Sequence, residues 1–142
     1  MRLVLDTNVI IRAMRSPKSA SAVLVAEALS GNVTPLVSTA LGLEYEAVAL
    51  RSEHWVAAGF GRSEAERLLA ALAEVSDPVE IAFHYRGVLQ DPNDEMVLEA
   101  AINGRAEALV TFNPRHFADA PERYGLALRD PKTILAELRK RR

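Results

Sequence analysis

Three carboxylate side chains occupy positions from which they could act together in a reaction. Asp6 directly follows an apolar run, Glu44 lies among apolar residues at helical spacing, and Asp94 follows a proline turn. Carboxylates held close together raise one another's pKa, and a divalent cation reverses that balance. With no cysteine and no suitably spaced histidine pair, oxygen ligands favour Mg²⁺ or Mn²⁺ over Zn²⁺. If the fold brings these acids together, they predict metal-assisted hydrolysis of a phosphodiester.

Each acid also has a purely structural explanation. Asp6 could cap the helix that follows it, since Asp is a preferred N-cap residue. The free amides and the dipole at a helix start would equally accommodate Asp94. Glu44 could be a partly exposed residue at the edge of an apolar stripe, paired with an arginine. The residue types alone leave these alternatives open.

The elements that would position the acids alternate between strand and helix. The apolar run into Asp6 is typical of a central strand covered on both faces of a parallel sheet, and ligands of such sheets bind beyond the carboxyl ends of the strands. Further strands are predicted at 35–38, 79–83, 108–111 and 126–128. Helices are predicted at 8–15, after Ser19 or Ser21 up to about 30, at 39–51, from Ser63 to about 76, after Pro92 to 103, and after Asp130-Pro131. This order predicts a three-layer α/β domain with a mainly parallel sheet.

Two local patterns refine these boundaries. Ser63 and Glu66 have the spacing of a capping box at a helix start. In the helix predicted at 39–51, Leu41, Glu44 and Tyr45 share one face, so Glu44 is expected on the buried stripe. A buried acid is costly unless it is paired or binds a cation.

Composition bounds the class of protein. The 142 residues, 49% hydrophobic and 25% charged, are those of one globular domain, 1–142. The absence of cysteine excludes disulfides, thiol catalysis and zinc–thiolate sites. No apolar run reaches the length of a membrane span and no signal peptide is evident, so a cytoplasmic protein is expected. A net charge of −2 argues against strong non-specific binding of nucleic acid by the whole surface, but a local basic groove is compatible with it.

The sequence resembles the PIN-domain ribonucleases, in particular the bacterial toxins related to VapC. The resemblance rests on an ordered set of segments that covers nearly the whole chain: Leu5-Asp6-Thr7-Asn8, Leu43–Val48, Asp91–Asp94, and Ala108–Asn113 followed by Phe117. It implies a three-layer α/β/α PIN-like fold and an acidic site that binds Mg²⁺ or Mn²⁺ and cuts RNA. Asp6, Glu44 and Asp94 match the family's acids, with Asp6 and Asp94 as direct metal ligands.

The resemblance also assigns supporting residues. Thr7, Asn8 and Thr111 match polar residues around the metal and its waters. Asp91 is either an auxiliary acid or a turn residue before the proline. The sequence departs from the family at a fourth acid, because the two positions where it is expected hold Asn113 and His116. Asn113 can still offer a carbonyl oxygen, but it carries no charge, so a second metal is disfavoured and activity could be weak.

RNA binding requires cations near the acids. Arg12, Arg15 and Lys18 follow Asp6, and Arg115 follows Asn113, so these side chains could contact phosphates. The alternative is that they are ordinary solvated surface charges.

These observations favour a metal-dependent endoribonuclease, the toxin of a pair, with an antitoxin partner that covers the groove and with a homodimeric state. The second interpretation is a PIN-fold module that binds RNA or protein with little or no catalysis, because the fourth acid is missing. A phosphatase of the haloacid dehalogenase type is a third interpretation, but it would need an aspartate at Asn8.

Overall fold

The computed structural model describes residues 1–59 and 61–141, and its centre is a parallel sheet. Its strands lie in the order β3-β2-β1-β4-β5. Their bounds are β1 Arg2–Leu5, β2 Thr34–Val37, β3 Asp77–Pro78, β4 Ala108–Val110 and β5 Leu128–Arg129. Leu5 at the end of β1 pairs with Val110 at the end of β4. The residues that follow these two strands therefore start side by side.

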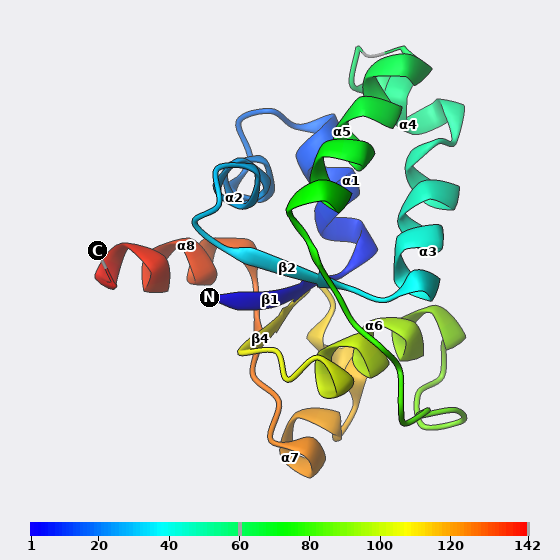
Figure 1. Ribbon diagram of the computed structural model, residues 1–142, viewed down its shortest axis with the longest axis vertical. Coiled ribbons are helices and arrows are strands. Elements are labelled where there is room, and N and C mark those ends of the chain that lie inside the picture. The colour runs from blue at the N-terminus through cyan, green and yellow to red at the C-terminus, as the bar shows by residue number, and fades with distance from the viewer. Residues whose placement is uncertain (60, 142) are drawn as a thin grey trace.

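Helices cover both faces of the sheet (Figure 1). The helices are α1 Thr7–Arg15, α2 Ala20–Leu29, α3 Thr39–Ala49, α4 Ser52–Ala57, α5 Arg62–Val75, α6 Pro92–Asn103, α7 Ala120–Tyr124 and α8 Pro131–Lys140, with a 3₁₀ turn, η1, at Pro114–Phe117. In Figure 1, α6 and α7 lie on one side of the sheet, and α1, α2 and α5 lie on the other. The predicted three-layer α/β/α arrangement is confirmed.

The central strands are buried on both sides, as the apolar run at the N-terminus predicts. Leu3, Val4 and Leu5 are 0–2% exposed, and Leu109 of β4 is fully buried. A parallel strand between two helical layers has no solvent face, so alternation is absent and the run is continuous. This burial fixes the end of β1, and with it the location of Asp6.

Side-chain caps begin several of the helices. The Ser19 hydroxyl accepts from the amide of Ala22 at the start of α2, and Asp130 accepts from the amide of Thr133 at the start of α8. Both residues were expected at helix starts. Ser38 caps α3 in the same way. These caps satisfy amides that have no partner within the helix.

Some predicted boundaries are wrong. At α5 the amide of Gly61 donates to the Glu64 carboxylate, so the helix starts earlier than a Ser63 cap requires. The helix predicted at 39–51 ends at Ala49, and the last strand is Leu128–Arg129 instead of 126–128. Residues 79–83 do not form a strand: the amide of Val79 still donates to the carbonyl of Val37 in β2, but the amides of Ala82 and Phe83 donate to the side chain of Asn103.

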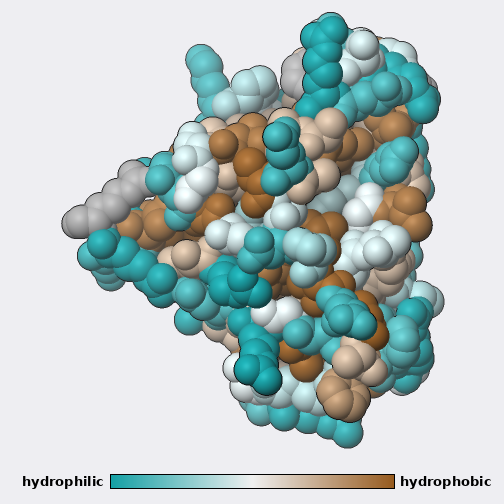
Figure 2. Space-filling model, viewed as in Figure 1, coloured by the Kyte–Doolittle hydropathy of each residue, from teal (hydrophilic) through white to brown (hydrophobic). Residues whose placement is uncertain are grey.

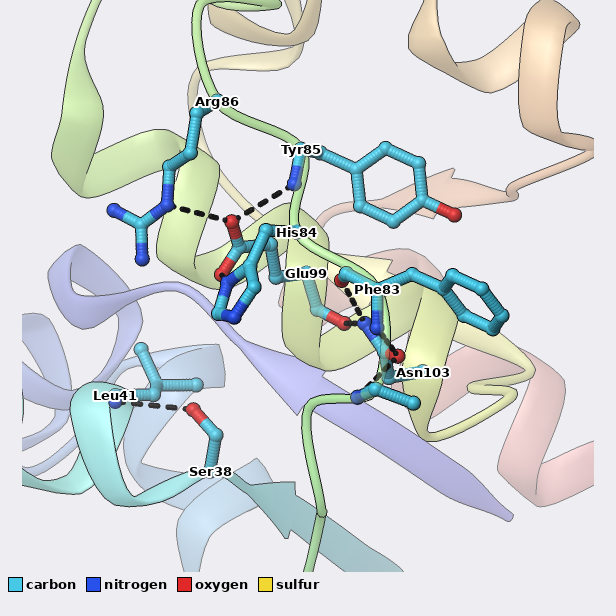
Figure 3. A network of polar contacts seen from close by, with 9 residues as sticks. Ser38, Leu41, Phe83, His84, Tyr85, Arg86, Glu99 and Asn103 are labelled. Atoms are coloured by element: carbon cyan, nitrogen blue, oxygen red, sulfur yellow. Dashed lines mark hydrogen bonds and ion pairs between the residues drawn. The ribbon is translucent and has the colours of Figure 1, made fainter.

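Three side chains of α6 hold the segment 82–89 against the helix, and Figure 3 shows two of them. Glu95 accepts from the amides of Val88 and Leu89, Glu99 accepts from the amide of Tyr85, and Asn103 accepts from the amides of Ala82 and Phe83. The three lie four residues apart on one side of α6, and this spacing suits an extended backbone running along the helix. The segment that leads to the first turn of α6 is thereby fixed.

An apolar groove separates α3 from α5, with Val37, Leu43, Leu50 and Leu69 among its lining residues. Figure 2 shows hydrophobic residues gathered over this part of the face. Within the described residues, no helix is long and apolar enough to cross a membrane.

Candidate active site

Asp6 lies between the end of β1 and the start of α1 and is 5% exposed. It occupies the N-cap position of α1, yet its side chain accepts no capping hydrogen bond from the described residues. Its Oδ2 instead accepts a hydrogen bond of 2.8 Å from Oγ1 of Thr111. The capping alternative therefore does not describe what this carboxylate does.

The chain after β4 completes this contact. The amide of Asp6 donates to the carbonyl of Val110, and the amide of Asn113 donates to Oγ1 of Thr111 at 3.0 Å. Thr111, 2% exposed, thus links both chain segments. Asn113 joins the network through its backbone, and its side chain makes no hydrogen bond within the described part of the chain.

Asp94 lies in the first turn of α6 and is 8% exposed. Asp91, not Asp94, caps this helix, since its Oδ1 accepts from the amide of Asn93 at 2.9 Å. Of the two roles predicted for Asp91, auxiliary acid or turn residue, the structure shows the turn role. The Asp94 carboxylate is left free to face His116, whose Nδ1 lies 3.4 Å from its Oδ2.

The two buried acids act on each other electrostatically. Burial raises the pKa of Asp94 to about 6, and the negative charges of Asp6 and Asp91 add to this, while His116 opposes it. Burial also raises the pKa of Asp6, against the hydrogen bonds from Thr111 and the backbone of Thr7 and the charge of His116. Asp6 and Asp94, which are far apart in the sequence, therefore share one site.

Tyr45 belongs to the same surroundings, although the sequence pattern assigns it only to the core. Its hydroxyl, on α3, donates to the carbonyl of Leu5 at the end of β1. Burial and the charge of Asp6 raise the pKa of the Tyr45 hydroxyl, so it remains a neutral donor. A polar group at the end of an aromatic core residue is the signal that could have indicated this role.

The structure does not bring Glu44 into the same close group. Its side chain is partly exposed, as in the edge-of-stripe alternative, and the expectation of a buried position is wrong because Tyr45 and Leu41 take the buried face of α3. Glu44 makes no hydrogen bond or ion pair within residues 1–59 and 61–141, so the arginine pairing is not observed either. Across those same residues no group of three or more His, Asp or Glu side chains is arranged to hold a metal ion.

The donors that are present nevertheless suit a hard cation. Mg²⁺ in proteins is commonly held by one or two carboxylates, with water and substrate phosphate completing its shell. Asp6 and Asp94 supply two oxygen donors whose raised pKa values reflect burial and repulsion that a cation would relieve. This donor set fits Mg²⁺ or Mn²⁺.

Comparison with known proteins identifies the family. A family model described as the PIN domain matches residues 2–115. The chain belongs to the PIN-domain family. PIN domains are generally nucleases that use divalent metals.

Solved structures support the same fold. The PIN domain is similar to a chain in the crystal structure of VapBC2 from Rickettsia felis bound to a DNA fragment from their promoter, with 19% identity and a TM-score of 0.63. The similarity covers 92% of this chain and 98% of that one. No curated protein gives a significant match.

The remaining residues of the predicted site fall into two groups. Thr7 is buried at the start of α1, and Asn8 is exposed beside it. Arg12 and Arg15 are exposed on α1, Lys18 in the turn that follows, and Arg115 in η1. Asn8, Arg12 and Arg15 line one groove, which does not include Lys18 or Arg115.

Proposed function

We propose that this PIN domain is a metal-dependent endoribonuclease that serves as the toxin of a toxin–antitoxin pair. The observation that carries the proposal is the pair of buried carboxylates, Asp6 and Asp94, with a pKa of Asp94 raised to about 6 partly by the charge of Asp6. Such a pair in a PIN domain suits a divalent cation and a phosphodiester.

Each residue has a distinct role in the proposal. Asp6 and Asp94 hold Mg²⁺ or Mn²⁺, and the cation, when bound, supplies a Lewis acid and lowers the pKa of a bound water. Thr111 orients Asp6 through its hydrogen bond, with Thr7 and Asn8 as polar neighbours. Glu44 and Asn113 act through waters, since neither side chain bonds to the acids. Asp91 adds negative charge while it caps α6.

His116 replaces an acid with a cationic or neutral ring beside Asp94. A protonated His116 offers a donor to a phosphate oxygen, and it offsets part of the repulsion between the carboxylates. One cation is therefore the expected stoichiometry. Arg12, Arg15, Lys18 and Arg115 supply further cations for the phosphates of the RNA.

The partners follow from the same proposal. A VapBC2 chain shares the fold, and the apolar groove between α3 and α5 is a surface that an antitoxin segment can cover. The protein works in the cytoplasm, as a single 1–142 domain that pairs into a homodimer. Co-purification with the product of an adjacent gene tests the antitoxin partner.

The deciding experiment is cleavage of a mixed RNA pool by the purified protein with Mg²⁺, Mn²⁺ or EDTA, beside the variant Asp6→Asn. Asp77→Asn makes the same chemical change at an exposed residue paired with Arg2 and serves as the control. Metal-dependent cutting by the wild type and by Asp77→Asn, lost in Asp6→Asn, is the expected result. Equal cutting by all three proteins would overturn the site.

The second candidate is a PIN-fold binding module with little or no catalysis. It is favoured by one observation, the presence of Asn113 and His116 where the family's fourth acid is expected. RNA binding without cleavage under any metal condition would select this candidate.

A further inference from the structure

The groove lined by Asn8, Arg12 and Arg15 is polar, unlike the apolar groove between α3 and α5, and it lies near Asp6. It is formed by α1, by the starts of α2 and α8, and by the residue after Thr111. Asn8, Arg12, Arg15, Ser21, Phe112 and Lys132 are among its lining residues. Asn8 comes two residues after Asp6, and Phe112 comes directly after the threonine that bonds Asp6. The groove therefore adjoins the acidic site.

The charge of this groove is positive in a protein of net charge −2. Arg12, Arg15 and Lys132 are exposed, and none of them forms an ion pair within the described part of the chain. Within the described residues, the one hydrogen bond of the Arg15 side chain joins its Nη1 to Nδ1 of the His54 ring, at 3.4 Å. The acid in the groove, Asp130, is engaged by the amide of Thr133 at 2.7 Å. The pKa of Asp130 is lowered by its hydrogen bonds with Thr133 and also by the charge of Lys132, so Lys132 is partly engaged. Three cations against one carboxylate still leave the groove positive, which favours an anionic ligand.

Phe112 presents an aromatic ring to the same groove. It is 45% exposed, although the strand before it is buried throughout. A ring left half open to solvent among cations is the combination that binds single-stranded nucleic acid, where bases stack and phosphates pair with cations.

Ser21 adds an independent sign of a ligand. It lines the groove, its residue is fully buried, and its hydroxyl has no hydrogen-bond partner among the described residues. Buried hydroxyls are nearly always paired in folded proteins. Because the Ser21 hydroxyl is closed off from solvent in the free protein, a phosphate oxygen or a bridging water reaches it only if the groove wall shifts on binding.

We propose that this groove is a nucleotide subsite, in which Phe112 stacks on an unpaired base and Arg12, Arg15 and Lys132 bind the flanking phosphates. The inference rests on the proposed function, because the RNA strand reaches the subsite from the acids. An acidic peptide would use the cations but would leave the aromatic ring without a role. The base at this position must be unpaired, because a ring cannot stack on a base inside a duplex.

The test is binding of a fluorescein-labelled 12-nucleotide single-stranded RNA, measured by anisotropy in the Asp6→Asn background so that cleavage does not intervene. Phe112→Ala should raise Kd by about tenfold, since a stacked base contributes about 1–3 kcal/mol and 1.4 kcal/mol is a factor of ten. Lys132→Ala should also raise Kd, because it removes a phosphate contact. Lys132→Ala should also lower the slope of log Kd against log salt by about 0.7.

Matched controls separate the subsite from general effects. Phe83 is 70% exposed on the segment that α6 holds, and Lys140 ends α8 far from the start of that helix. Phe83→Ala and Lys140→Ala should leave Kd unchanged. Thermal melts of all four variants exclude misfolding as the cause.

Three outcomes would overturn the subsite: equal Kd values for Phe112→Ala and Phe83→Ala, no RNA binding at all, or groove-dependent binding of a poly-glutamate peptide in place of RNA. If the wild type cleaves RNA and Phe112→Ala binds RNA as tightly as before, the nuclease function is supported and the subsite is contradicted. If RNA binding depends on Phe112 but the wild type does not cleave RNA, the subsite is supported and the nuclease function is contradicted. If both proposals hold, Phe112→Ala and Lys132→Ala in the wild-type background raise KM and leave kcat nearly unchanged.

Discussion

Two neighbouring acids on α6 have opposite electrostatic surroundings. Asp94 faces Asp6 and Asp91, and its pKa is raised to about 6 by burial and by their charges. Glu95 accepts hydrogen bonds from the amides of Leu89 and Val88, which lower its pKa. The charge of Asp94 therefore lowers the stability of the fold, whereas the charge of the adjacent Glu95 raises it.

Asp94→Asn is expected to stabilise the metal-free protein. The folded pKa of Asp94 lies above the ordinary 3.8, so the stability of the wild type falls as pH rises from about 4 to above 6. Removing the charge should recover about 1 kcal/mol at pH 7.5, a value reduced for solvent screening, or about 3 °C in Tm. The gain should vanish at pH 3, below the ordinary pKa of 3.8, where Asp94 is largely protonated in both the folded and the unfolded protein. Thermal melts at the two pH values measure it, with Asp119→Asn, an exposed acid, as the control.

Glu95→Ala is expected to act in the opposite direction. It leaves the amides of Val88 and Leu89 without their acceptor, so Tm should fall and the Leu89 amide should exchange faster with deuterium. Because the pKa of Glu95 is lowered in the folded state, its contribution is present above pH 4.5 and is lost as pH falls through the lowered value. Glu66→Ala, which removes an exposed ion pair with Arg62, should change little. Similar melts for the two variants would contradict this role of Glu95.

At the scale of residues, the sequence predicts positions better than contacts. Asp6 and Asp94 could be found because each marks the boundary of an element with a strong apolar pattern. The contact of Asp94 with His116, and the bond from Tyr45 to the end of β1, join residues far apart in the sequence and leave no local pattern. Helical spacing also put Glu44 on the buried face, since a periodicity cannot tell the centre of a stripe from its edge.

At the scale of elements, α6 connects the site to the sheet. Its first turn carries Asp94, and its last turn is followed by Gly104, which packs against Val79 and Leu36 of the neighbouring segments. A Cβ at Gly104 would lie 2.7 Å from the carbonyl of Ala100 and 2.9 Å from Val79. The absence of a side chain there sets how closely the end of α6 approaches the sheet.

Gly104→Ala should therefore destabilise the fold by about 1–3 kcal/mol, as overpacking does. Gly42 is the matched control, since a Cβ there meets only Val37, at an ordinary 3.4 Å, in the interior of α3. Gly42→Ala should stabilise by about 0.5–1 kcal/mol, because alanine is the better helix former. Urea denaturation measures both, and equal signs for the two substitutions would refute the packing argument.

Helices and strands could likewise be predicted where local residues determine them, but not where a distant contact does. The helices after Ser19, Pro92 and Asp130 could be predicted, because caps and prolines at their starts act within one turn. The strand predicted at 79–83 is wrong, because the amides of Ala82 and Phe83 donate to the side chain of Asn103 on α6 instead of to a neighbouring strand. Only the folded helix could reveal that acceptor.

At the scale of the whole molecule, topology assembles the site. The parallel pairing of β1 with β4 brings Asp6 to Thr111 across 105 residues, and α6 brings Asp94 to the same edge. The alternation of strand and helix predicts this edge, because parallel strands end together and their ligands bind there. This arrangement brings the negative charges of Asp6, Asp91 and Asp94 together, and His116 offsets their repulsion only in part.

A divalent cation should relieve that cost and stabilise the whole domain. Binding to the folded state alone raises stability by RT ln(1 + [L]/Kd), so the Tm of the wild type should climb with the logarithm of Mn²⁺ or Mg²⁺ concentration. Asp6→Asn and Asp94→Asn should each lose most of this climb, Asp119→Asn should retain it, and EDTA should return the wild type to its starting Tm. NaCl at matched ionic strength controls for screening. A flat wild-type response would rule out a metal site in the free protein, and a climb that survives in both site variants would locate the cation elsewhere on the molecule.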